Sequence, residues 1–191
     1  MIQPTTARAV SSAETSSSLC IRAMREDDLE AVQAIDRLSF SLPWPASAFR
    51  YELLENLQSF LRVAEIVQSE GSSQVVGAAV VWMVLDEAHI ATIAVHPGYR
   101  QRGIARQLMV DILKESYRRG AELVTLEVRH NNLAAQKLYR RFHFDVVGHR
   151  PHYYQDNHED ALIMTLKELN QTYIEWLDSG SWMDNELTQR G

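Results

Sequence analysis

The sequence predicts a single α/β domain, with a mixed, mostly antiparallel sheet of about seven strands and helices on both faces. The chain has 191 residues, which is enough for one compact core and too few for two. In the first half, segments with the apolar alternation of strands follow one another directly. In the second half they alternate with amphipathic helical segments, and this order implies a mixed sheet that is covered on both sides.

The N-terminal part contains a polar leader, one strand and one helix. Residues 1–18 lack apolar periodicity, so we expect a disordered leader and a domain that covers residues 19–166. The first strand is expected over residues 19–24. The acids of residues 26–28 favour a helix start, because a helix N-terminus attracts negative charge, and apolar residues continue at helical spacing over residues 31–38.

Pro43 and Pro45 end this first helix, since two prolines in three residues cannot continue it. A second, short helix is expected over residues 46–55. Three strands of an antiparallel meander follow, over Phe60–Val67, Val75–Leu85 and Glu87–Val95.

Helices and strands alternate after the meander. Apolar residues from Ala105 to Leu113 lie on one face of a helix that Gly120 ends as a C-cap. Residues 123–128 alternate as a strand, and residues 135–142 again share a helical face.

Two closing strands complete the expected sheet. They are predicted over residues 144–148 and 161–166, joined by a long polar and aromatic loop, Arg150 to Ala161. Residues 167–191 are expected to form a C-terminal helical extension, with its helix over residues 167–177.

The composition excludes several classes of function. A formal net charge of -6 speaks against a nucleic-acid binder, which must neutralise phosphates. The longest apolar run, Val75 to Leu85, is about half of the roughly 20 residues that span a bilayer. The N-terminus lacks the apolar core of a secretory signal, and the single Cys20, expected to be a buried strand residue, has no partner for an internal disulfide. We therefore expect a cytoplasmic protein that binds neither nucleic acid nor membrane; the sequence carries no signal for an oligomeric state.

The segment RQRGIAR, residues 100–106, stands between an expected strand and the start of a long helix. Backbone N–H groups at a helix start are unpaired, and the helix dipole adds about half a positive charge there. Gly103 and Ala105 are small enough for close approach, and Arg100, Arg102 and Arg106 add positive charge. The segment thus predicts a pyrophosphate site, with an ordinary helix start and solvated arginines as the alternative.

In these residues the sequence resembles the GNAT superfamily of N-acetyltransferases. The family motif Arg/Gln-x-x-Gly-x-Gly/Ala is matched by Arg100, Gly103 and Ala105. The resemblance implies acetyl-CoA as co-substrate, with its pyrophosphate on Gln101, Arg102, Gly103, Ile104, Ala105 and Arg106. It also implies that a splayed strand at Ile93, Ala94 and Val95 pairs with the pantetheine arm.

A second motif follows one strand later. The pattern Glu-Val-Arg, then Asn-x-x-Ala, then Leu-Tyr is similar to the RimI branch of this superfamily, which acetylates ribosomal-protein N-termini, and it is matched here by Glu127, Asn132, Ala135 and Tyr139. The resemblance implies Glu127 as general base, Asn132 as a contact to acetyl-CoA and Tyr139 as general acid. From pattern alone, Glu127 also fits a solvent-facing residue or a partner of Arg129, and Tyr139 fits a core position.

The acceptor side is expected at two aromatic segments. The R-x-x-Y-Y pattern in the closing loop, together with the loop of Pro43 to Pro45, is similar to the segments that flank the acceptor in the same branch. The expected substrate contacts are Trp44, Tyr153, Tyr154 and Glu159. Three nearby histidines, His149, His152 and His158, lack the spacing of a metal site on a helix, so no metal is expected.

The sequence therefore favours an acetyl-CoA-dependent enzyme that acetylates a protein N-terminus, such as that of a ribosomal protein. A lysine or small-amine N-acetyltransferase and a catalytically silent CoA-binding module remain as alternatives. One position departs from the family pattern: His143 stands where a glycine usually supplies a left-handed helix C-cap.

Overall fold

The computed structural model describes residues 17–69 and 71–183. They form one seven-stranded sheet in the order β1-β2-β3-β4-β5-β7-β6. The strands are β1 Ser17–Ala23, β2 Ser59–Gln68, β3 Ser73–Val84, β4 Glu87–Val95, β5 Leu123–Arg129, β6 Asp145–Tyr154 and β7 Glu159–Leu166. The α-helices are α1 Leu29–Ser39, α2 Ala48–Leu54, α3 Ile104–Arg118, α4 Leu133–Arg141 and α5 Gln171–Asp178. The predicted mixed, mostly antiparallel sheet is confirmed, because only the β4–β5 pair is parallel.

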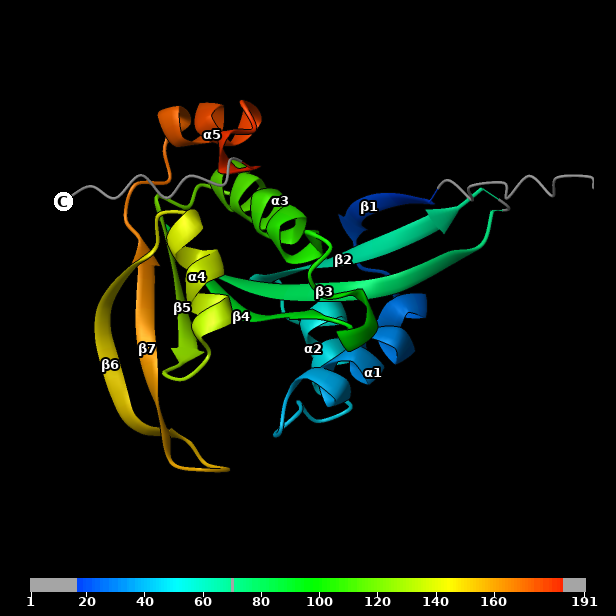
Figure 1. The fold of residues 1–191 in the computed structure, drawn as a ribbon, viewed down its shortest axis with the longest axis horizontal. Coiled ribbons are helices and arrows are strands. Elements are labelled where there is room, and N and C mark those ends of the chain that lie inside the picture. The colour runs from blue at the N-terminus through cyan, green and yellow to red at the C-terminus, as the bar shows by residue number, and fades with distance from the viewer. Residues whose placement is uncertain (1–16, 70, 184–191) are drawn as a thin grey trace, which may run out of the picture.

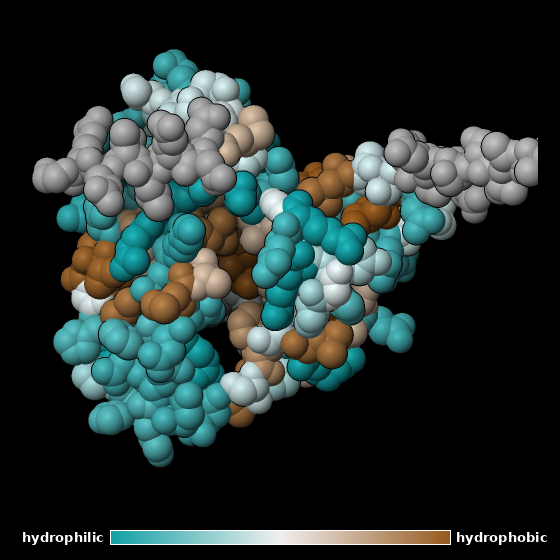
Figure 2. Space-filling view, in the orientation of Figure 1, coloured by the Kyte–Doolittle hydropathy of each residue, from teal (hydrophilic) through white to brown (hydrophobic). Residues whose placement is uncertain are grey.

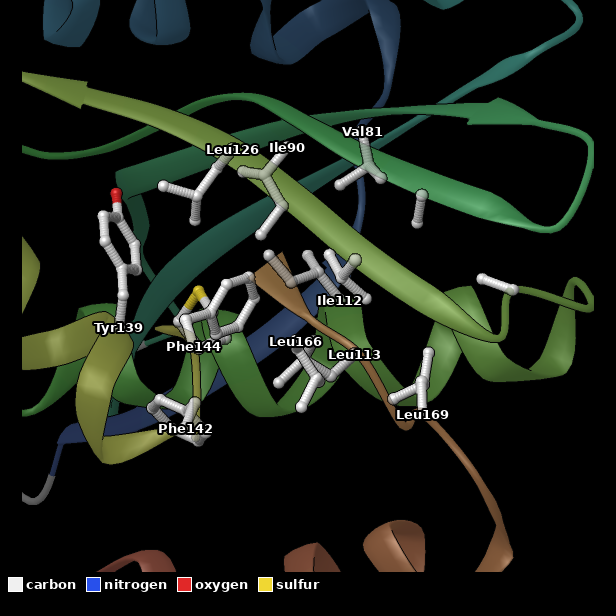
Figure 3. Close-up of a cluster of buried hydrophobic side chains, with 14 of the residues drawn as sticks. Val81, Ile90, Ile112, Leu113, Leu126, Tyr139, Phe142, Phe144, Leu166 and Leu169 are labelled. Atoms are coloured by element: carbon white, nitrogen blue, oxygen red, sulfur yellow. The ribbon is translucent and has the colours of Figure 1, made fainter. Parts of the chain in front are cut away.

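Helices cover both faces of this sheet (Figure 1). Alternate residues of β3 point to opposite sides: Val80 packs in the cluster with α1 and α2, whereas Val81 packs in the cluster with α3 and α4. Figure 3 shows the larger cluster, in which strand residues such as Leu126 face Ile112 and Leu113 of α3. Burial of such side chains, each worth about 1.5–3 kcal/mol, fixes α3 and α4 against the sheet.

The sheet divides at the β4–β5 junction. β4 and β5 pair only from Glu87 opposite Leu123 to Ile90 opposite Leu126. At this point the β3–β4 register shifts and leaves Ala91 as an extra residue, a β-bulge that bends β4. Beyond it, β4 stays with β3 while β5 stays with β7 (Figure 1), so the two strands diverge and leave one edge of β4 unpaired.

Several expected boundaries were wrong, most of them on edge strands. The loop expected from Arg150 to Ala161 is mostly strand, since β6 runs to Tyr154 and only residues 155–158 form the turn. β6 is an edge strand, where Pro151 is tolerated and polar residues face solvent on both sides, so its sequence has the composition of a loop. Its irregular pairing with β7 lies between Arg150 and Tyr154, where His152 has a φ of 52°.

The first strand and the last helix also differ from expectation. β1 begins at Ser17, inside the expected leader, and residues 1–16 lie outside the described part of the chain. Cys20 is exposed, not buried, because β1 is the other edge of the sheet. The C-terminal helix begins at Gln171, four residues later than expected, after Asn170 caps it by accepting a hydrogen bond from the Tyr173 N–H at 3.0 Å. Among the described residues, none of the helices has the length and hydropathy needed to cross a bilayer.

Candidate active site

The loop between β4 and α3 presents unpaired backbone N–H groups. Gln101 and Gly103 have positive φ angles of 63° and 81°, and Gly103 is the residue before the first turn of α3. These two left-handed residues turn the chain so that, among the described contacts, the amides of residues 101–105 donate to no protein acceptor. A Cβ on Gly103 would have no atom within 4 Å, so the space in front of the loop is open. An anion that accepts several N–H bonds fits here.

The three arginines of this segment have different surroundings. The Arg100 Nε donates to the Val95 carbonyl at 3.0 Å, and its terminal nitrogen donates to Ser39 at 3.2 Å. Arg100 therefore links the end of β4 to α1 by hydrogen bonds and has a structural role. Arg102 is exposed and stacks over the Tyr99 ring at 5.1 Å, while Arg106 is half-buried on the first turn of α3.

The expected pantetheine strand has one free edge. Ile93, Ala94 and Val95 pair with residues 79, 78 and 77 of β3, and no strand pairs with their other edge, because β5 has already diverged. The splay that the resemblance required is thus present. An extended amide-containing chain can add to such an edge as a strand would.

Glu127 lies at the splay, on the sheet face opposite its buried neighbours. Leu126 and Val128 are 1% and 4% exposed and face α3 and α4, whereas the Glu127 carboxylate points to the α1–α2 side. Its two oxygens contact the His89 Nε2 and an Arg150 guanidinium nitrogen, each at 3.1 Å. Glu127 does not pair with Arg129, and its side chain, 12% exposed, is held between β4 and β6.

His89, which the sequence interpretation missed, is fixed by an aromatic stack. Its ring lies 5.6 Å from that of Trp82, which lies 6.2 Å from that of Trp44, which in turn lies 5.1 Å from that of Phe49. Trp44 is therefore half-buried in the core and also borders the expected acceptor side. The available signal was a lone polar side chain at position 89, facing the same side of the sheet as Glu127.

Tyr139 approaches from the other face of the sheet, on α4. Its side chain is 6% exposed, and its ring lies 6.0 Å from that of Phe144. Figure 3 shows the hydroxyl oxygen pointing away from Phe142 and Phe144, and this oxygen makes no hydrogen bond to any described residue. Burial raises the pKa of Tyr139 above its ordinary value, so the phenol keeps its proton at neutral pH.

Asn132 precedes Tyr139 by two helical turns and has a structural role. Its side-chain oxygen accepts from the Ala135 N–H at 3.1 Å and so caps α4. Only its side-chain N–H₂ remains for a ligand, and the predicted contact to acetyl-CoA stays a prediction.

The β6–β7 hairpin carries the other expected acceptor residues. Tyr154 stacks under the Arg129 guanidinium at 3.9 Å, and burial raises its pKa to about 12. Tyr154 also interacts electrostatically with both Glu127 and Tyr139, so the expected base, the expected acid and this tyrosine lie in one region. Tyr153 is 44% exposed, and its ring contacts Arg150 at 5.5 Å and Tyr154 at 5.3 Å; its predicted contact to a substrate stays a prediction.

Glu159 is already occupied within the hairpin. One carboxylate oxygen accepts from the Asn131 N–H at 2.8 Å, and the other contacts Arg129 and Asn157, each at 3.2 Å. The backbone N–H of Asn131 and the neighbouring cation hold the pKa of Glu159 below its ordinary value. This carboxylate links the hairpin to Asn131 and Arg129, and its predicted role as a substrate contact stays a prediction that the geometry does not support.

The tip of the hairpin also touches the loop after α1. Asp156 accepts hydrogen bonds from Arg129 and from Ser41, so the two segments that flank the expected acceptor side meet there. In residues 17–69 and 71–183, no three His, Cys, Asp or Glu side chains gather in a way that could hold a metal ion.

The family model described as "Acetyltransferase (GNAT) family" matches residues 29–144 of this chain. A Bacillus subtilis protein, provisionally named a ribosomal protein bS18-alanine N-acetyltransferase, is 37% identical over 144 residues, which are 75% of this chain and 92% of that protein. The Escherichia coli (strain K12) ribosomal protein bS18-alanine N-acetyltransferase is 32% identical over 148 residues, 76% of this chain and 95% of that protein.

Two solved structures show the same fold. The crystal structure of the ribosomal-protein-S18-alanine N-acetyltransferase from Escherichia coli superposes with a TM-score of 0.68 at 30% identity and covers 78% of this chain and 93% of that chain. The structure of Ard1 from Thermoplasma volcanium superposes with a TM-score of 0.68 at 26% identity, over 80% of this chain and 99% of that chain.

Proposed function

Because this chain belongs to the GNAT family of acetyltransferases, we propose that it transfers the acetyl group of acetyl-CoA to the N-terminal α-amine of a ribosomal protein. The observation that carries the proposal is the splay between β4 and β5. It leaves a free strand edge that leads to the open amides at the start of α3, with Glu127 on one side of the sheet and Tyr139 on the other.

Donor binding follows from this edge and these amides. The free edge of residues 93–95 suits the amide groups of a pantetheine arm, and the N–H groups of residues 101–105 suit a pyrophosphate. Arg102 and Arg106 add positive charge to the same turn, while Arg100 holds it in place. No metal is needed for this arrangement, because backbone dipoles and arginines supply the positive field.

Acetyl transfer then needs one base and one acid. The Glu127 carboxylate takes a proton from the acceptor amine, directly or through one water, and the neutral nitrogen attacks the thioester carbonyl carbon. As the new C–N bond forms and the C–S bond breaks, the Tyr139 hydroxyl gives its proton to the leaving sulfur. The nitrogen becomes positively charged on attack and releases its second proton to water to give the neutral amide, and Tyr139 regains a proton from water. Acetyl-CoA and the acceptor protein are bound at the same time, so the acetyl group passes directly between them and no acetylated enzyme forms.

An α-amine suits this site better than a lysine side chain does. An N-terminal amine has a pKa of about 7.7–8.0 and is partly neutral at pH 7, whereas lysine, near 10.4, is almost wholly protonated. A single carboxylate is therefore sufficient for the α-amine. The relatives named for N-terminal alanine acetylation and the half-exposed Tyr153 on the acceptor side support the same choice. The proposed substrates, acetyl-CoA and a ribosomal protein, support a cytoplasmic reaction as part of the same proposal.

Mass spectrometry of peptides incubated with acetyl-CoA tests the proposal. Peptides with the first residues of a ribosomal protein are supplied with a free or a blocked N-terminus, and each contains one lysine. We expect acetylation of the free α-amine only, and loss of this product in the Glu127→Gln variant. Modification of lysine in the blocked peptide would favour a lysine acetyltransferase. Binding of acetyl-CoA without transfer to any amine would favour a silent module.

A further inference from the structure

Helix α4, which carries Tyr139, ends in an unusual way. The Phe144 N–H donates to the Tyr139 carbonyl at 3.1 Å, and the His143 N–H donates to the Arg140 carbonyl at 3.1 Å. These two bonds form a Schellman motif, whose left-handed residue is usually glycine. Here the left-handed residue is His143, with a φ of 60°, a conformation that costs an L-residue energy.

This helix end also fixes the backbone of the general acid. The Tyr139 carbonyl accepts hydrogen bonds from Phe142, at 2.9 Å, and from Phe144, at 3.1 Å. The rings of Tyr139 and Phe144 lie 6.0 Å apart. A loosened helix end would therefore displace both the main chain and the ring of Tyr139.

The C-terminal extension packs directly on the same helix end. The Tyr173 hydroxyl donates to the Phe142 carbonyl at 2.8 Å in a buried position, which satisfies one of the last carbonyls of the helix. The Trp176 ring lies 4.5 Å from the ring of His143, a residue that stays exposed on its other sides, and the Arg141 guanidinium donates to the Trp182 carbonyl at 2.9 Å.

The extension is itself firmly attached to the domain. The Leu169 N–H donates to the Glu122 carbonyl at 2.8 Å, and Lys114 of α3 forms an ion pair with Asp178 at 2.5 Å. Leu177 is 2% exposed in the same cluster of buried side chains that contains Tyr139. Leu169, Leu177 and Asp178 lie beyond residue 144, where the match to the family model ends.

We propose that residues 169–183 position the general acid. Tyr173 and Trp176 hold the end of α4 in the Schellman geometry, and the ring contact of Trp176 offsets the cost of a left-handed His143. The extension thereby takes the place of the glycine that a Schellman motif usually has. The inference rests on the proposed function, because it assigns Tyr139 the role of acid.

A double-mutant cycle in the full chain tests the contact. Glycine at position 143 relieves the left-handed strain but loses the ring contact, so His143→Gly alone should leave the melting temperature unchanged or lower it. In a Trp176→Ala background the closer ring contact is already absent, and only the wider contact of His143 to the Tyr173 ring, at 5.9 Å, can still be lost. The relief then dominates, and the same substitution should raise the melting temperature by about 2–4 °C. If His143→Gly changed the melting temperature equally in the wild-type and Trp176→Ala backgrounds, the two residues would not be coupled and the inference would be overturned.

Kinetic measurements distinguish an extension that positions Tyr139 from one that only stabilises the fold. Trp176→Ala should lower kcat roughly ten-fold, since displacements of about 1 Å cost up to about 10²-fold, with the KM for acetyl-CoA unchanged. Adding His143→Gly should restore most of kcat. Tyr173→Phe, which removes only the hydroxyl, is the second variant if Trp176→Ala does not fold, and it should also lower kcat without changing KM.

Unchanged kcat in both folded variants would leave the extension as a stabilising element only and would contradict the proposed positioning. A wild-type chain that acetylates no amine would instead contradict the proposed function. The melting-temperature cycle needs no activity, so it still tests the contact between His143 and Trp176 in that case.

Discussion

The Tyr139→Phe variant separates the hydroxyl of Tyr139 from its ring. The ring contributes packing, at 6% exposure and against Phe144, whereas the hydroxyl makes no hydrogen bond to a described residue. Removing the oxygen therefore leaves every described contact in place. We expect the free energy of unfolding to change by less than about 1 kcal/mol, because no intramolecular hydrogen bond is lost.

The catalytic effect should be much larger than this. Loss of a general acid lowers kcat by about 10²–10⁴-fold, which corresponds to roughly 2.7–5.4 kcal/mol of transition-state stabilisation. A structural disturbance below about 1 kcal/mol would explain only about a five-fold change. The two ranges do not overlap, so the size of the effect decides whether Tyr139 is an acid or a core residue.

The assay follows initial rates with a free N-terminal peptide at saturating acetyl-CoA. Acetyl-CoA affinity, measured by calorimetry, should stay as in the wild type, since the hydroxyl is proposed to act only on the leaving sulfur. Tyr117→Phe is the matched control: this half-buried tyrosine lies on α3, and its hydroxyl contacts Gln171 at 3.3 Å. A Tyr139→Phe enzyme with the kcat of the control would refute the reasoning.

Three further outcomes follow from the site. Glu127→Gln should lower kcat by about 10²–10⁴-fold at neutral pH with acetyl-CoA affinity retained, and a loss of affinity without a loss of kcat would contradict its role as base. Gly103→Ala should weaken acetyl-CoA binding and destabilise the fold by about 1–2 kcal/mol, because the φ of Gly103 is 81°. The control is Gly71→Ala in the β2–β3 turn, where φ is 80°: it should cost the same stability and leave acetyl-CoA binding, measured by calorimetry, unchanged. Burial raises the pKa of Asp36 despite the hydrogen bond from the Trp44 N–H at 2.7 Å. The folded protein therefore loses stability as pH rises through that pKa and the buried carboxyl becomes charged. Asp36→Asn removes this charge and should raise the melting temperature at pH 7. This gain should shrink toward pH 3.8, the ordinary pKa, and a gain independent of pH would show that the buried charge is not its source.

The elements with strong periodicity could be predicted from the sequence. The third meander strand was expected over Glu87–Val95 and has those bounds, and the helix after Gly103 begins at Ile104. Both segments bury one regular face, so the apolar pattern reports the structure directly. The pair of closing strands was expected and is present, but the second half of β6, residues 149–154, was missed, because an exposed edge strand with Pro151 and a left-handed His152 has no such pattern.

The candidate site was predictable where a motif assigns one residue to one role, and less so where partners are distant in the sequence. The roles proposed for Glu127 and Tyr139 come from local patterns, but His89 and Arg150, which hold Glu127, come from two other strands. Arg100 belongs to the expected phosphate motif, yet its donors are taken by Val95 and Ser39. Sequence spacing carries no information on such tertiary hydrogen bonds.

The splay is the feature on which the chemistry depends most and which the sequence shows least. Glu127 and Tyr139 lie on opposite faces of the sheet, and a continuous sheet would separate them by its own backbone. The bulge at Ala91 and the change of partner of β5 after Leu126 open the sheet at this place. Under the proposed function, a thioester that lies along the free edge of β4 is accessible to Glu127 from one face and to Tyr139 from the other. The position of one unpaired strand residue would thus explain how the proposed base and the proposed acid, on opposite faces, act on the same bond.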